Sequence, residues 1–108
     1  MENLNNKVQL TGFIGNHVQL IDTSRTKIAT VSVAANSYSR KEGKNVKNTV
    51  WHKLVGFNDA AYEMAGLRKG DRVLVHGYLK DASYTKDNKT ISKIELVVQY
   101  LKKIPKTY

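Results

Sequence analysis

Hydrophobic and polar residues alternate with a period of two along most of this chain, which is the pattern of β-strands that bury one face. The strands predicted from it span residues 6–15, 28–35, 50–57, 72–84 and 90–101. Glycines inside these strands, at positions 12, 56 and 77, predict bulges or tight bends. Residues 58–65 break the alternation, since Asn58 can cap a helix and Gly66 can end one. The pattern therefore predicts a small closed or nearly closed barrel, with one short helix between the third and fourth strands.

The segment 48–57, NTVWHKLVGF, is the most informative stretch of the sequence. It places Trp51, the only tryptophan, two residues before Lys53 and six before Phe57. In an extended strand these three side chains share one face, because side chains alternate between the two faces. Two flat rings on either side of an ammonium group make a poor core but a suitable platform for a base and its phosphate.

Charge and composition narrow the possible functions. Lys and Arg total 18 against 9 Asp and Glu, so the chain carries a net charge of +9 and favours a polyanionic partner or an anionic membrane surface. Without cysteine it can form neither disulfides nor thiolate metal sites. We expect no cofactor and no metal, since the histidines show no metal-ligand spacing, and no enzyme, since no nucleophile–base pair or phosphate-binding glycine loop stands out. The polar start and the lack of a long apolar run predict a soluble, cytoplasmic protein.

Two polar segments, 39–48 and 83–89, read as long, mobile hairpin tips that carry much of the charge. Their basic residues are Arg40, Lys41, Lys44 and Lys47 in the first, and Lys86 and Lys89 in the second. Aromatic residues flank both segments, Tyr38 and Trp51 at the first and Tyr84 at the second. They are either ordinary solvated loops or basic fingers whose lysines neutralise phosphates while the rings stack on unpaired bases. The second interpretation predicts binding of single-stranded nucleic acid.

Three segments in order, 6–12 (NKVQLTG), 49–57 (TVWHKLVGF) and 67–79 (LRKGDRVLVHGYL), give the chain a family resemblance. Over nearly its whole length it resembles the bacterial single-stranded DNA-binding protein (SSB) family. The resemblance implies an OB-fold, a five-stranded Greek-key barrel with the helix between strands 3 and 4. It also implies binding of single-stranded DNA in replication, recombination and repair, with little sequence preference. The implied DNA-binding domain is 1–101, followed by a short basic end at 102–108.

The resemblance also implies roles for individual residues. The DNA-stacking positions of the family fall on Tyr38, Trp51, Phe57 and Tyr84. Its basic positions fall on Lys7, Lys53, Lys69 and Lys80, which we expect to bind phosphate together with the lysines and arginine of the two loops. His52, on the face opposite Trp51, is implied at a contact between subunits, since the family is usually homotetrameric.

Some features depart from the family pattern. Tyr38 and Tyr84 stand where many relatives have tryptophan. Asp59 and Asp81 lie near the DNA track, where relatives are often basic. The family usually ends in an acidic tip that recruits replication and repair proteins, whereas this chain ends in a basic segment. We expect such partners only if an acidic tail exists beyond residue 108. Two alternatives remain open, an accessory protein of the primosomal replication protein B type and an RNA-binding OB domain.

Overall fold

Eight β-strands and one α-helix form the part of the chain that the computed structural model describes, residues 6–105. The elements are β1 (Val8–Ile14), β2 (Gln19–Asp22), β3 (Lys27–Lys41), β4 (Lys44–Phe57), α1 (Asp59–Ala65), β5 (Arg72–Asp81), β6 (Tyr84–Lys86), β7 (Lys89–Ile91) and β8 (Ile94–Ile104). The first five residues of the predicted domain and residues 106–108 of the predicted basic end lie outside the described residues. No helix within residues 6–105 is long and apolar enough to cross a membrane.

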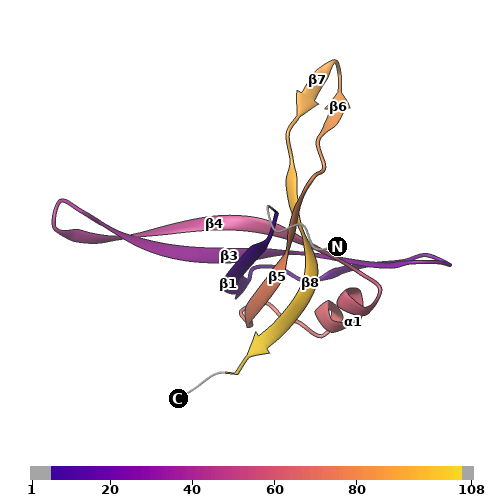
Figure 1. Ribbon diagram of the computed structural model, residues 1–108, viewed down its shortest axis with the longest axis horizontal. Helices are drawn as coiled ribbons and strands as arrows, with labels where there is room; N and C mark the ends of the chain where they lie inside the picture. The colour runs from indigo at the N-terminus through magenta and orange to yellow at the C-terminus, as the bar shows by residue number, and fades with distance from the viewer. Residues whose placement is uncertain (1–5, 106–108) are drawn as a thin grey trace.

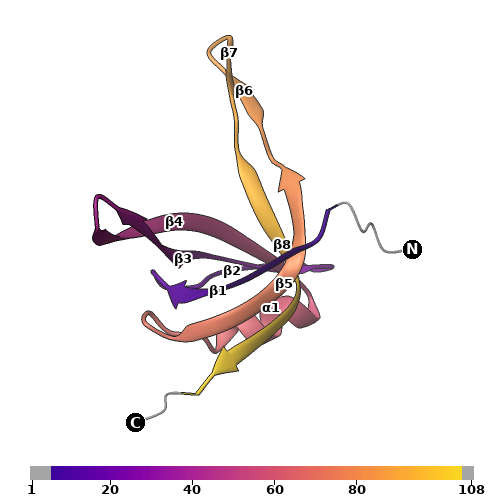
Figure 2. The same cartoon turned by 60° about the vertical axis from the view of Figure 1, so that its left-hand side comes forward.

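Five strands close into a barrel, in the order β1-β5-β8-β4-β3 (Figures 1 and 2). Closure comes from β1, which pairs with β5 along most of its length and with β3 at its end, through Phe13 and Ile14. The pairing of β4 with β8 is parallel, and the other pairings are antiparallel. The predicted all-β barrel with one short helix is confirmed.

The six-stranded sheet contains one strand, β2, that the sequence pattern did not predict. All residues of β2 are exposed, so no buried–exposed alternation marks this strand, which pairs only with the edge of β3. In the structural numbering the helix therefore lies between β4 and β5, although it still follows the third strand of the barrel itself. The last strand also runs three residues further than expected. It continues to Ile104, because Lys102 and Ile104 pair with Leu74 and Arg72 of β5.

The core lies inside the barrel and is filled by the inward residues of each strand. Its largest fully buried side chains are Ile14, Leu54, Met64, Leu96, Val33, Val73 and Val75. The helix α1 contributes Ala61 and Met64 to this core. A β-bulge lies between His76 and Gly77, as the glycine predicts, and a Cβ at Gly77 would collide with the carbonyl oxygen of Val97. The backbone of β8 thus leaves no room for a side chain at the position of the bulge.

Two β-hairpins extend from the barrel in different directions (Figures 1 and 2). The long arm, residues 36–49, is the outer part of β3 and β4, and the short arm, residues 84–91, consists of β6 and β7. Their turns have positive φ at Glu42 and Gly43 and at Asp87 and Asn88, which suits the twist of a tight hairpin. The segments expected as loops are therefore mostly paired strands. Their polar side chains hid this, because a two-stranded arm has no buried face to produce an apolar period.

Candidate nucleic-acid interface

The outward face of β4 carries Trp51, Lys53 and Phe57, as the alternation predicts. In register with β3 these residues lie opposite Ala34, Ser32 and Ile28. The side chain between them, Leu54, is fully buried in the core. We call this face, with Trp51, Lys53 and Phe57 on it, the platform. The barrel thus fixes which way all three point.

Trp51 packs against the backbone of Gly15. A Cβ at Gly15 would overlap the far edge of the indole ring, so the ring packs directly against this glycine. Gly15 is itself held, because its N–H donates to the carbonyl of Ser32 at 2.9 Å. The tryptophan nevertheless remains 61% exposed. A large ring that packs against Gly15 on one side and is exposed to solvent on the other is suited to stack on a base.

The long arm continues the face of the platform. Tyr38 pairs with Lys47 and lies an even number of residues from Ala34, so by register its side chain leaves the arm on the Trp51 side. Its exposure of 72% is the highest among the four predicted stacking residues. Arg40 follows on this face, whereas Lys41 and Lys44 pair with each other on the opposite one. Of the predicted basic residues of the long arm, Arg40 and Lys47 therefore lie on the platform side, whereas Lys41 and Lys44 lie on the opposite side.

Lys53 is not a free cation. Its Nζ lies 3.0 Å from Oε2 of Glu95 on β8, with which it is in register. Hydrogen bonds with Lys93 and with Glu95 raise the pKa of Lys53. Across β8, Lys80 pairs with the same Glu95. The sequence analysis predicted Lys53 and Lys80 but missed Lys93 and Glu95, whose importance depends on the pairing of distant strands.

The other two predicted lysines on the barrel lie at its edges. Lys7 is exposed. It lies beside β5, because the side chain of its neighbour Asn6 makes hydrogen bonds of 2.8 and 2.9 Å with the backbone of Leu79. Lys69 is exposed in the turn before β5, next to Gly70, whose N–H donates to the carbonyl of Ile14 at 2.8 Å. Ile14 directly precedes Gly15, so this bond joins the Lys69 turn to the strand end that carries the glycine in contact with Trp51.

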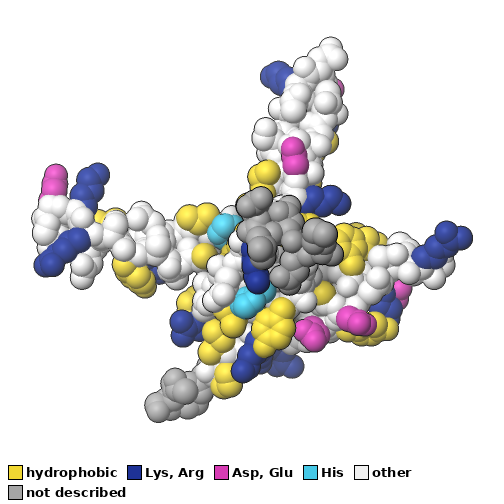
Figure 3. Space-filling view, in the orientation of Figure 1, with side chains coloured by type: hydrophobic (Ala, Val, Ile, Leu, Met, Phe, Trp, Pro, Cys, Tyr) yellow, Lys and Arg dark blue, Asp and Glu magenta, His cyan; other side chains and the backbone are white. Residues whose placement is uncertain are grey.

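The short arm carries Tyr84, Lys86 and Lys89. Tyr84 pairs with Ile91, and Lys86 with Lys89, so all of them share one face of the arm. Figure 3 shows Lys and Arg side chains on both arms and near their junction with the barrel. Asp81, at the root of the short arm, accepts a hydrogen bond from the N–H of Ser83 at 2.8 Å. Hydrogen bonds from the side chain and backbone of Ser83 lower the pKa of Asp81, so this carboxylate shapes the turn.

Two further residues border the site. Phe57, at the far end of the platform, is 38% exposed and the least accessible of the four predicted stacking residues. Phe13, which the sequence analysis did not single out, pairs with Ala34 and is therefore on the same outward face as Trp51. The guanidinium of Arg72 lies 5.9 Å from its ring centroid. Only the meeting of β1 and β3 at barrel closure places Phe13 there.

His52 faces away from the platform. It pairs with the buried Val33 and is itself half-buried, on the side of Leu54. Along the long arm this inner face continues with Val50 and Val46, which are 52% and 36% exposed because no barrel covers them. Within residues 6–105, no group of three His, Asp or Glu residues is placed to hold a metal ion.

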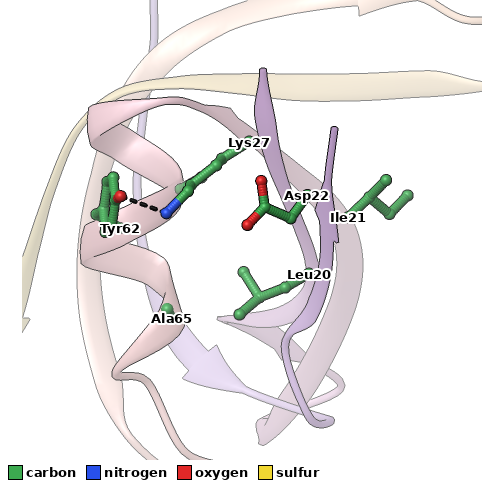
Figure 4. A pocket seen from close by; sticks show the side chains of 7 residues that line it. Leu20, Ile21, Asp22, Lys27, Tyr62 and Ala65 are labelled. Atoms are coloured by element: carbon green, nitrogen blue, oxygen red, sulfur yellow. Dashed lines mark hydrogen bonds between the residues drawn. The ribbon is translucent and has the colours of Figure 1, made fainter. Parts of the chain in front are cut away.

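A small pocket of about 130 Å³ lies between β2 and α1, beyond the Phe57 end of the platform (Figure 4). Its apolar walls come from Leu20, Ala61 and Ala65. At its edge Lys27 donates a hydrogen bond to the hydroxyl of Tyr62, and its ammonium lies 4.0 Å from the tyrosine ring centroid. This hydrogen bond raises the pKa of Lys27. The pocket does not join the platform residues.

The closed five-stranded barrel, with its helix after the third barrel strand, is an OB fold. Residues 5–104 match the family model of the single-strand binding protein family, and the chain belongs to this family.

Solved structures are similar over most of the chain. An SSB of Plasmodium falciparum, in complex with ssDNA, is 25% identical with a TM-score of 0.84, over 97% of this chain and 99% of that one. The small single-stranded DNA-binding protein of Streptomyces coelicolor is 13% identical with a TM-score of 0.79, over 96% of each chain. A deletion mutant of the Thermus aquaticus single-stranded DNA-binding protein is 19% identical with a TM-score of 0.80, over 93% of this chain and 50% of that one. The last two similarities concern the fold alone.

Proposed function

We propose that this chain binds single-stranded DNA with little sequence preference and protects unpaired strands in replication, recombination and repair. The observation that carries the proposal is Trp51, which lies open on the platform, seated on Gly15 and two residues from Lys53. A ring presents the same flat surface to every base, so stacking tolerates any sequence. Membership of the single-strand binding protein family and the similarity to a Plasmodium falciparum SSB in complex with ssDNA support it.

In this proposal the aromatic residues stack on bases and the basic residues neutralise phosphates. The stacking residues are Tyr38, Trp51, Phe57 and Tyr84, and the phosphate-binding residues are Lys7, Arg40, Lys41, Lys44, Lys47, Lys53, Lys69, Lys80, Lys86 and Lys89. The exposure of the aromatic side chains supports the first role. Two arms that spread the positive charge beyond the barrel support the second, because a strand that follows them gains contacts over a longer path.

Tryptophan fluorescence tests the proposal directly, because Trp51 is the only tryptophan. Saturating oligo-dT should quench its emission strongly, and a duplex of equal length should quench it far less. Oligo-U of equal length separates DNA from RNA binding, since a preference for RNA would favour the RNA-binding alternative. Emission that stays unquenched in saturating oligo-dT would remove Trp51 from the binding surface and contradict the proposal.

We further propose that the chain assembles as a homotetramer and that His52 lies at a contact between subunits. The observation in favour is the inner face of the long arm, where Val50 and Val46 are exposed beside His52 in the single chain. A second subunit on this face would remove these apolar side chains from water.

Sedimentation of the variant His52→Glu tests the assembly. A carboxylate on this face should shift the wild-type species towards dimer or monomer while the far-UV circular dichroism stays unchanged. His17→Glu is the matched control, since His17 is exposed in the segment between β1 and β2. A monomeric wild type, or a His52→Glu variant that sediments like His17→Glu, would contradict the proposed contact.

A further inference from the structure

Charged side chains gather where the short arm leaves the barrel, and they come from three different strands and a connecting segment. Lys53 of β4 and Glu95 of β8 form the ion pair of 3.0 Å, and Lys80 of β5 is in register with the same Glu95. Lys93 belongs to the segment between β7 and β8. Its N–H donates to Oγ of Ser83 at 3.2 Å, and its carbonyl accepts from the N–H of Ala82 at 2.8 Å. The backbone of Lys93 is thus held at the root of the short arm.

Lys93 lies two residues before Glu95, which is in register with Lys53, so an extended chain directs the side chains of Lys93 and Lys53 to the same side of the sheet, within reach of a hydrogen bond. This bond and the repulsion between the two charges lower the pKa of Lys93. One carboxylate, Glu95, forms the ion pair with Lys53 and acts on Lys93 only through its charge, and its side chain is only 16% exposed. A further anion between the two amino groups would relieve their repulsion and accept the hydrogen bonds that they cannot make to each other when both are charged.

We propose that Lys53 and Lys93 together form a binding site for one phosphodiester group of a nucleic-acid strand, and that Glu95 occupies Lys53 until the phosphate displaces it. The site deepens the proposed function and rests on it. It also supplies a link between two parts of the surface. Lys53 is on the platform beside Trp51, and Lys93 is at the root of the arm that carries Tyr84, so a phosphate here guides the strand from one to the other.

Titrations with oligo-dT over a series of salt concentrations, followed by Trp51 fluorescence, test the site. Because each neutralised phosphate contributes roughly −0.7 to the slope of log affinity against log salt on single strands, Lys93→Gln should make the slope shallower by about this amount. Its affinity at low salt should fall severalfold, and Lys93→Arg should restore it. Glu95→Gln should raise the affinity at low salt severalfold, because Lys53 then has no internal partner.

Arg25→Gln is the matched control, since it removes the same charge from the exposed segment between β2 and β3. Far-UV circular dichroism and a thermal melt establish that each variant is folded. Equal affinity and slope for Lys93→Gln and Arg25→Gln would overturn the site, and unchanged or weaker binding by Glu95→Gln would overturn the role of Glu95. Quenching of the wild type tests the proposed DNA binding alone, whereas the difference between these variants tests only the subsite.

Discussion

The two arms are both β-hairpins with tight turns, but they are joined to the barrel differently. The long arm is a direct continuation of β3 and β4, and their pairing runs without interruption from Ile28 and Phe57 to Lys41 and Lys44. The short arm forms a sheet of its own, with strands of three residues each. Residues outside either strand ladder separate it from β5 and β8, and two hydrogen bonds connect its root, one from the N–H of Ala82 to the carbonyl of Lys93 and one from the N–H of Lys93 to Oγ of Ser83.

This difference decides how well each arm positions its aromatic residue. The register that buries Val33 in the core also places Tyr38 on the same face as Trp51, because both belong to one uninterrupted strand. Tyr84 has no such relation to the barrel, and its direction depends on the turn built by Asp81 and Ser83. A preorganised ring loses less entropy on binding than one that must first be ordered. Equal side chains on the two arms should therefore contribute unequally.

The largest expected effect comes from removing the aromatic side chains one at a time. Trp51→Ala should weaken binding of oligo-dT by about 1–3 kcal/mol, since stacking on one aromatic residue contributes this much. Tyr38→Ala should cost less, because its ring is smaller, and Tyr84→Ala should cost least of the three. Since Trp51→Ala removes the fluorescent reporter, calorimetry or electrophoretic mobility should measure all three variants.

Tyr62→Ala is the matched control for the two tyrosines, because Tyr62 is exposed on α1, away from both arms. It should leave the affinity for oligo-dT unchanged. A loss in Tyr84→Ala that equals or exceeds the loss in Tyr38→Ala would contradict the idea that continuity with the barrel makes the long arm the better positioned one.

A smaller effect should follow from Gly15→Ala, which leaves every aromatic side chain in the protein. A methyl group at this position would overlap the indole of Trp51, so the ring must tilt away from its seat while the barrel strands stay paired. We expect a shifted emission maximum, weaker quenching by oligo-dT and a loss of affinity smaller than that of Trp51→Ala. Gly66→Ala is a suitable control, because a Cβ there would meet no neighbouring atom. Unchanged emission and affinity in Gly15→Ala would mean that the ring does not depend on this seat.

The sequence was sufficient to predict the features that follow from a buried face. Trp51, Lys53 and Phe57 could be assigned to one face because the neighbouring Leu54 is apolar, and the bulge at Gly77 and the helix at 59–65 carried local signals. The arms could be predicted as hairpin tips, but the extent of strand pairing in them and the existence of β2 could not, because strands exposed on both faces show no hydrophobic period. The pairing of Lys53 with Glu95, and the seat of Trp51 on Gly15, join residues far apart in the chain. Single-sequence reasoning contains no information on such partners.

The lysines of the arms should show the same contrast in their dependence on salt. In the long arm Lys47 is on the face of Trp51 and Lys44 on the opposite one. Lys47→Gln should therefore reduce the slope of log affinity against log salt by roughly 0.7, and Lys44→Gln should reduce it less. In the short arm Lys86 and Lys89 pair on one face, so Gln at either position should have the same effect as at the other. Equal slopes for Lys47→Gln and Lys44→Gln would show that the strand does not follow the face set by the register.

The smallest expected effect is a dependence on alkaline pH that originates at the root of the short arm. Contact with Lys53 lowers the pKa of Lys93, whereas the pKa of Lys53 is raised, so Lys93 should lose its proton first as the pH rises towards the ordinary lysine value of about 10.4. A phosphate stabilises the ammonium form, so binding in this range should take up a proton and the affinity should fall as the pH rises. Lys93→Arg should flatten this fall, because a guanidinium stays charged. The measurement is the affinity for oligo-dT against pH at constant salt, and identical curves for the wild type and Lys93→Arg would exclude Lys93 as the titrating contact.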